Sequence, residues 1–261
     1  MVIWKIVLIG LLTTIVRIIA QLLIPAGSQA VLMPSVFAQN GTMPVAFTLY
    51  GIVAYSIIAL LFLQVREGIG GKRIARGLKY AVSCCLIWSI YLLEPLPHVA
   101  LLDKFTYPVA DSVALLVMGA LSGLLLCEKK EHIIENKSSI GIVSTMIIAG
   151  FFVIGRLFQY RVFNIYSSFS DQKTETLIWA ASAGLIVGIV LQWLESKMSV
   201  KNRNARIAIL GFVLFGVDLL LFNFFMPIVF DADIPDLIIR TCIDVISVTV
   251  GCFAKSRVNG N

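Results

Sequence analysis

Apolar runs of membrane-spanning length recur along the whole sequence and constrain the fold more than any other feature. A transmembrane helix needs about 20 mostly apolar residues, because the hydrocarbon core of a bilayer is about 30 Å thick. These runs do not alternate as the strands of a membrane barrel would. The sequence therefore predicts an all-α polytopic membrane protein with eight spans, at residues 6–24, 45–64, 80–96, 108–127, 139–160, 176–194, 207–226 and 237–254.

The balance of residue types agrees with a membrane protein. Of the 261 residues, 59% are hydrophobic and only 14% are charged, whereas about 25% of residues are charged in soluble domains. The net charge of +6 does not indicate nucleic-acid binding, because the basic residues lie in short segments without interleaved aromatic residues. Such segments suit contact with anionic lipid headgroups. The lipid bilayer is the expected partner, and nucleic acid is not.

The distribution of lysine and arginine predicts the orientation of the spans. Fifteen of the 21 basic residues lie in the two terminal segments and in alternate loops, three lie in the opposite loops, and three lie inside spans. Cytoplasmic loops carry the excess of basic residues in membrane proteins. Both termini are therefore expected in the cytoplasm, in a multi-pass protein of the plasma membrane. The basic loops are 65–79, 128–138 and 195–206.

Cysteine and histidine give no sign of a disulfide framework, a metal site or a cofactor. All five cysteines lie within or at the end of apolar runs, and none lies in a predicted exterior loop. The two histidines, His98 and His132, are far apart in the sequence. We expect no bound metal and no cofactor.

The two halves of the chain resemble each other, four predicted spans against four. TLYGIVAYSIIALLFLQ at 48–64 aligns without gaps on TLIWAASAGLIVGIVLQ at 176–192, and RIAR at 73–76 matches RNAR at 203–206. An even number of spans in each half makes the repeats parallel, related by an axis along the membrane normal. The predicted division is a first four-helix repeat at 1–127, a cytoplasmic linker at 128–138 and a second four-helix repeat at 139–261.

Charged residues correspond between the halves as well. IVRIIAQ in the first predicted span matches IGRLFQY in the fifth, which places Arg17 against Arg156. In the last span of each half, Asp111 corresponds to Asp244 at an offset of 133 residues. A site between the halves is the usual consequence of a duplicated membrane protein.

Ionisable residues inside the spans are the main candidates for a functional site. Each costs about 2.5–3.5 kcal/mol at a helix centre on insertion scales, so each needs a partner or water. Most of them, with the amide of Asn223, lie in the outer half of the membrane. This distribution favours an outward-facing polar cavity that binds a small charged or zwitterionic solute. The candidates are Arg17, Glu94, Asp111, Arg156, Asp218, Arg240 and Asp244.

Structural ion pairing is the alternative interpretation of the same charges. Arg17 with Asp111, and Arg156 with Asp244, would pair across helices, while Arg240 and Asp244 are four residues apart on one helix. Asp218 is the strongest single functional candidate, because its counterpart in the first half is the neutral Trp88.

The motif YLLEPLPH at 91–98 ends the third predicted span with two prolines. We expect Glu94 and His98 at the exterior rim, where a charge is inexpensive, so a helix stop is favoured over a catalytic acid. If the motif has a function, His98 is suited to sense exterior pH.

Small residues and prolines give local predictions. Glycines four residues apart, at Gly119/Gly123 and Gly184/Gly188, predict close packing between helices. Pro108 is expected at the outer end of the fourth span, because proline interrupts a helix interior.

Three classes of function remain open from the sequence. A small secondary transporter or solute-binding permease with a 4+4 parallel repeat is favoured. A membrane enzyme acting on a lipid or prenyl substrate would need paired acids for a metal or a base, and the aspartates are scattered singly. The third class is a non-transporting resistance, immunity or accessory subunit. An enzyme is less expected than a non-enzyme, and the sequence does not define an oligomeric state.

Overall fold

The computed structural model describes residues 2–24, 29, 31–128 and 140–258, and in these residues it is helical without a β-strand. The predicted linker at 128–138, with His132, lies outside the described residues except for Glu128. The long helices, each corresponding to one predicted span, are α1 (Val2–Leu23), α3 (Met43–Leu61), α4 (Arg73–Leu92), α5 (Asp103–Leu126), α6 (Ile142–Phe158), α7 (Lys173–Lys197) and α11 (Ile234–Val258).

Shorter helical segments extend or connect the long helices. The 3-10 turns η1 (Phe62–Gln64) and η2 (Arg66–Gly68) follow α3, and the π-helical η3 (Gln159–Phe163) continues α6. The span between α7 and α11 is built from α8 (Arg203–Ala208), η4 (Ile209–Val217), α9 (Asp218–Asn223) and α10 (Met226–Val229). The remaining short helix is α2 (Val36–Gln39).

Seven of these helical segments are long and apolar enough to cross a membrane, which supports the prediction of a polytopic membrane protein. The remaining predicted span, 80–96, is the third along the chain, and α4 (Arg73–Leu92) covers its residues 80–92. Its first two turns carry Arg73, Arg76 and Lys79, so α4 is less apolar than the other seven. It is also the helix that contacts α5 of its own half and α7 and α9 of the other.

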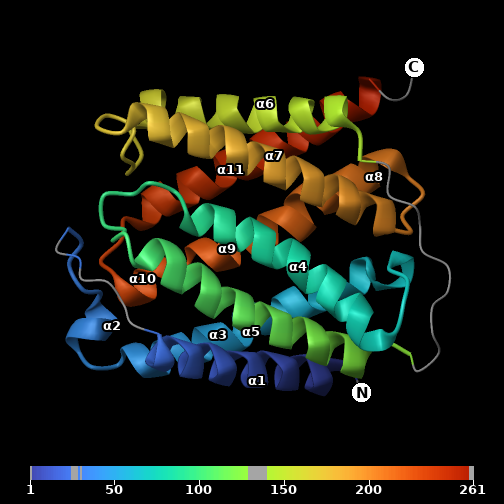
Figure 1. The fold of residues 1–261 in the computed structure, drawn as a ribbon, viewed down its shortest axis with the longest axis horizontal. Helices are drawn as coiled ribbons and strands as arrows, with labels where there is room; N and C mark the ends of the chain where they lie inside the picture. The colour runs from blue at the N-terminus through green and yellow to red at the C-terminus, as the bar shows by residue number, and fades with distance from the viewer. Residues whose placement is uncertain (1, 25–28, 30, 129–139, 259–261) are drawn as a thin grey trace.

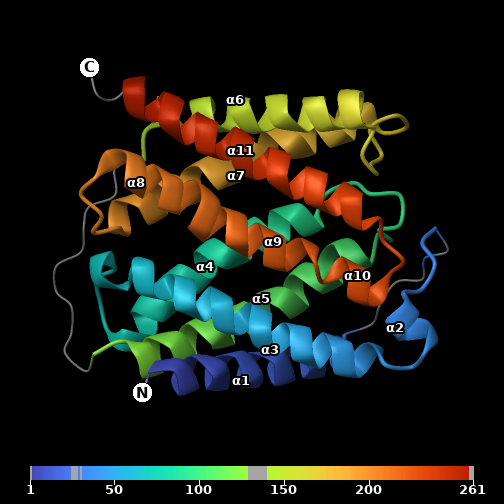
Figure 2. The same cartoon turned by 180° about the vertical axis from the view of Figure 1, so that it is seen from behind.

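The first half of the chain forms one layer of the molecule and the second half forms the other (Figure 1). In Figures 1 and 2, α1 and α6 lie on the two outer surfaces, and α4 and α9 lie on the inner sides of the layers, where the two halves meet. Within the first half, α1 packs on α3 and α5, and α4 packs on α5. Within the second, α6 packs on α7 and α11, and η4 packs on α11. The beginning of α1 and the end of α11 lie at one end of the molecule, and α2 and α10 lie at the other.

Close packing at the predicted glycines is confirmed. A Cβ atom on Gly119 would lie 2.4 Å from Ala81 Cβ and 2.6 Å from the Gly77 carbonyl oxygen, and one on Gly184 would lie 2.9 Å from Ala149 Cα. These glycines let the backbones of α4 and α5, and of α6 and α7, approach without side chains between them.

The seventh predicted span, 207–226, is not one continuous α-helix. Nine residues of π-helix separate α8 from α9, and Asp218 is the first residue of α9. Gly211 lies in this wide turn, where a Cβ atom would be 2.1 Å from Thr249 Oγ1 of α11. The glycine therefore allows the wide π-helical turn to pack on α11. A π segment inside an α-helix often marks a functional site.

The expectation that Pro108 ends a span is wrong. Helix α5 begins at Asp103, five residues earlier, so Pro108 lies in its second turn. Pro108 has no N–H to donate to the Lys104 carbonyl, so the helix lacks one backbone hydrogen bond in its second turn.

The contact between α4 and α5 predicts a specific sensitivity to one added methyl group. Gly119→Ala should lower the free energy of unfolding by about 1–3 kcal/mol, because overpacked methyl groups displace a backbone. The matched control is Gly150→Ala in α6, where an added Cβ meets nothing within 4 Å. Denaturation of the purified protein in detergent tests this. Equal stabilities of the two variants would contradict the close contact.

Candidate functional site

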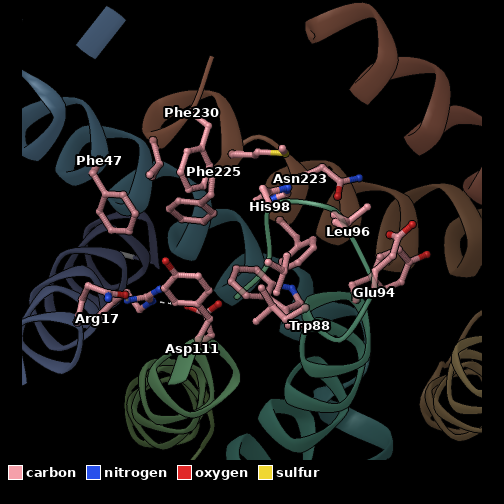
Figure 3. A pocket seen from close by; sticks show the side chains of 18 of the residues that line it. Arg17, Phe47, Trp88, Glu94, Leu96, His98, Asp111, Asn223, Phe225 and Phe230 are labelled. Carbon is pink, nitrogen blue, oxygen red and sulfur yellow. Dashed lines mark hydrogen bonds and ion pairs between the residues drawn. The ribbon is translucent and has the colours of Figure 1, made fainter. Parts of the chain in front are cut away.

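A cavity of about 470 Å³, shown in Figure 3, lies between the two halves beside α10, which contacts α2. Its wall is built from α1, α3, α4 and α5 of the first half and from α9, α10 and the start of α11 of the second. The volume is within the range of small-molecule sites, about 300–1,000 Å³. Most of the lining is apolar, and much of it is aromatic: Phe47, Tyr55, Trp88, Tyr91, Tyr107, Phe222, Phe225 and Phe230.

The first of two buried ion pairs lies on the cavity wall. Arg17 of α1 donates through Nε to Asp111 Oδ1 of α5 and through Nη1 to Gln21 Oε1 at 2.8 Å. The guanidinium lies 5.9 Å from the ring centroid of Phe47. Both charged residues are 7% exposed, and both line the cavity. The pair therefore presents a positive and a negative group, side by side, to any molecule in the cavity.

The second ion pair is sealed inside the protein. Arg156 of α6 is 0% exposed and donates through Nη2 to Asp244 Oδ2 of α11 at 2.6 Å. Its guanidinium lies 4.7 Å from the ring centroid of Trp179 and 5.3 Å from that of Tyr91. Gln159 donates to the other Asp244 oxygen at 2.6 Å. Every oxygen of the Asp244 carboxylate thus has a protein donor.

Glu94 does not lie at an exposed rim, and the expectation that it does is wrong. It follows the end of α4, but α6 and α11 flank it and leave it 2% exposed. Arg156 Nη1 donates to its two oxygens at 3.1 and 3.3 Å, and Arg240 Nη1 donates to Oε2 at 3.0 Å. Tyr160 adds a hydroxyl donor at 3.3 Å. Glu94 therefore ties its own half of the protein to two arginines of the other half.

The proposed pairing of Arg240 with Asp244 along one helix face is also absent from the described residues. Arg240 instead pairs with Glu94 and, at 3.9 Å, with Asp236 one turn earlier in α11. Its Nη2 group donates to the Tyr166 carbonyl oxygen. Two arginines and two carboxylates, Arg156, Arg240, Glu94 and Asp244, thus form a buried group, with the partly exposed Asp236 at its edge. We call this group the central charge network.

Asp218 lies behind the cavity rather than on its wall. It is 3% exposed, and the indole Nε1 of Trp88 donates to its Oδ1 at 3.2 Å. No lysine, arginine or histidine among the described residues forms an ion pair with it. Trp88 does line the cavity, so this one side chain contacts both. Asn223 lines the cavity and donates to Thr241 Oγ1 at 2.8 Å.

His98 lines the cavity beside Tyr166, with its Nδ1 atom 3.1 Å from the tyrosine hydroxyl. Burial lowers the pKa of His98 from its ordinary 6.5 to about 4, and the positive charge of Arg240 contributes to the same shift. The imidazole is therefore neutral near pH 7, and protonation requires a medium close to pH 4.

The cavity thus brings together six of the nine residues predicted for the site and leaves Arg156, Asp218 and Asp244 off its wall. The aromatic lining was not predicted, because hydropathy does not show which face of an apolar helix a ring occupies. In the described residues, no group of three or more histidine, cysteine, aspartate or glutamate side chains is placed to hold a metal ion.

No protein-family model matches the chain, and neither a curated protein nor a solved structure matches it.

Proposed function

We propose that the protein is a small secondary transporter or solute-binding permease of the plasma membrane, whose solute occupies the cavity between the two halves. One observation carries this proposal: a buried ion pair, Arg17–Asp111, lies on the wall of an aromatic cavity built from both halves. Concave, largely apolar sites with a few convergent polar groups are typical of small-molecule binding. An ionisable residue inside a membrane span is by default a functional candidate.

A duplicated architecture of eight spans, with α4 as the third, is part of the proposal. The two matched arginines make matched ion pairs, Arg17 with Asp111 and Arg156 with Asp244, in matched helices. The packing order within the halves also agrees: the first helix of each half packs on the second and fourth, and the third packs on the fourth. Unrelated apolar helices would not be expected to share both features.

Ion pairs at the opposite end of the molecule support the duplication independently. Arg76 Nη2 lies 3.9 Å from Glu67 Oε2 in the first half, and Arg206 Nε lies 3.4 Å from Glu195 Oε1 in the second. The two arginines end the matched RIAR and RNAR segments. The two glutamates correspond at the offset of 128 residues that aligns 48–64 on 176–192.

The contact between Trp88 and Asp218 is expected from such a repeat. These residues correspond at an offset of 130, and equivalent residues of two repeats can touch only near the axis that relates the repeats. The cavity, with Trp88 on its wall, therefore lies beside this axis. A site beside the axis is where binding sites form in duplicated transporters.

We further propose that the cavity faces outward and that both termini are cytoplasmic. The beginning of α1 and the end of α11 lie at the end of the molecule that holds the basic loops 65–79 and 195–206 (Figure 1). The cavity lies toward the opposite end, near α2 and α10. The excess of basic residues favours the cytoplasm for the first end.

Labelling from outside the cell tests the orientation. We expect a membrane-impermeant maleimide to label a variant with Asn40→Cys, just after α2, and to leave Lys201→Cys unlabelled until the cells are opened. Both positions are exposed in the structure. The parent chain, with its five native cysteines, supplies the background. Labelling of position 201 but not position 40 in intact cells would reverse the proposed orientation.

Solute binding is tested on the purified full chain with panels of zwitterions, anions, amines and neutral solutes. At least one class should raise the midpoint temperature of thermal unfolding. At a concentration 100 times Kd, the bound solute adds about 2.7 kcal/mol to the free energy of unfolding. Arg17→Gln should remove this effect, because Arg17 lies on the cavity wall. Arg161→Gln, at an exposed position outside the cavity, should retain it.

The outcome of that panel separates the proposed functions. Stabilisation together with uptake of the same solute by proteoliposomes supports a transporter, and stabilisation without uptake indicates a receptor. If no class stabilises the parent and Arg17→Gln only lowers the folded yield, the ion pair is structural. A non-transporting accessory subunit is then the better description.

A further inference from the structure

We propose that the solute is a zwitterion carrying a carboxylate and an ammonium group on an apolar body, and that its carboxylate binds Arg17 as Glu94 binds Arg156. This inference rests on the proposed function and on the duplication. It names the class of solute and the atoms that hold it.

The two matched arginines differ in how completely the protein surrounds them. Arg156 contacts two carboxylates, those of Glu94 and Asp244, and is fully buried. Arg17 contacts one carboxylate, that of Asp111, and lines the cavity. Arg156 therefore has one more carboxylate partner than Arg17 has.

The two residues that add charge around Arg156 have neutral counterparts in the other half of the chain. Glu94 corresponds to Phe224 at the offset of 130, and Arg240 corresponds to Tyr107 at the offset of 133. Tyr107 and Phe225, the neighbour of Phe224, line the cavity. Glu94 contacts Arg156, and Arg240 in turn contacts Glu94. The corresponding region beside Arg17 holds aromatic rings and an open volume.

The balance of charges around the two arginines favours a solute that carries one positive and one negative group. The central charge network contains two positive and two negative groups, and the Arg17–Asp111 pair contains one of each. A zwitterion would keep the first site neutral, as Glu94 and Arg240 keep the second. A simple anion or cation would bring one uncompensated charge to a site lined largely by aromatic side chains, and burial of an unpaired charge is costly.

The ion pair on the cavity wall has one free group for each charge of such a solute. Arg17 uses Nε and Nη1 for Asp111 and Gln21, and its Nη2 has no hydrogen-bond partner among the described residues. Asp111 Oδ2 likewise accepts no hydrogen bond from them. A guanidinium binds a carboxylate strongly. An ammonium is held by a carboxylate and by aromatic faces such as that of Phe47.

The rest of the lining favours an apolar or aromatic body for the solute. Figure 3 shows Phe47, Phe225 and Phe230 on one side of the cavity and Trp88 on another, with Arg17 and Asp111 at one end. An aromatic amino acid combines this body with the two charged groups. Phenylalanine is therefore the probe that the geometry favours.

The test compares phenylalanine with 3-phenylpropanoate, phenylalaninamide and 2-phenylethylamine, by calorimetric titration of the purified full chain. The first analogue lacks the ammonium, and the other two lack the carboxylate. We expect phenylalanine to bind at least tenfold more tightly than each analogue. Arg17→Gln should weaken phenylalanine binding by at least tenfold, and Arg161→Gln should leave its Kd unchanged.

A second variant tests where the carboxylate binds even if Arg17→Gln does not fold. Phe47→Glu places a protein carboxylate next to the guanidinium, since the Phe47 ring centroid is 5.9 Å from it. This side chain should occupy Arg17 as Glu94 occupies Arg156 and abolish phenylalanine binding while the protein stays folded. Unchanged phenylalanine affinity in Phe47→Glu would contradict the proposed binding mode.

The remaining outcomes separate this inference from the proposed function. Two outcomes would contradict the proposed zwitterion and leave the proposed solute site in place. In the first, a single-charge analogue binds as tightly as phenylalanine. In the second, phenylalanine does not bind, but another class of solute stabilises the chain through Arg17. If neither phenylalanine nor any other class binds, the inference and the proposed function both fail.

Discussion

The architecture depends on the guanidinium of Arg156, which holds one carboxylate from each half of the chain. Glu94 comes from the segment after α4, and Asp244 comes from α11, so one buried cation joins both layers of the molecule. The desolvation of three charged groups is offset only because Arg240, Gln159, Tyr91 and Tyr160 satisfy the remaining lone pairs. The boundary between the halves is therefore fixed at this point, and the cavity forms beside it.

The two matched arginines differ in their exposure to the cavity: Arg17 lines it, whereas Arg156 lies behind Glu94 and Arg240, which line it. Arg156 contacts Glu94 and Asp244 and is covered by aromatic rings, whereas Arg17 contacts the single carboxylate of Asp111 beside the cavity. We infer that structural and solute-binding roles, which the sequence alone leaves as alternatives, are divided between the two copies.

Sequence patterns predicted the helical membrane fold, because span length and apolar content follow from bilayer thickness alone. They also named the Arg17–Asp111 and Arg156–Asp244 pairs, because opposite charges in apolar spans need partners. They misplaced Glu94, because its position after a helix does not reveal that α6 and α11 cover it. They also did not show the π-helical turn before Asp218, since that turn depends on packing against α11 rather than on local propensity.

The central claim is that Arg156 is structural and Arg17 serves the solute, and the free energy of unfolding tests it most directly. The purified single variants Arg156→Gln and Arg17→Gln should be compared under one set of conditions. Arg156→Gln should lose about 3–5 kcal/mol, because it leaves Asp244 buried without its ion-pair partner and Glu94 with Arg240 alone. Arg17→Gln should lose less than half as much, because Asp111 lines the cavity. Equal losses in the two variants would contradict the division of roles.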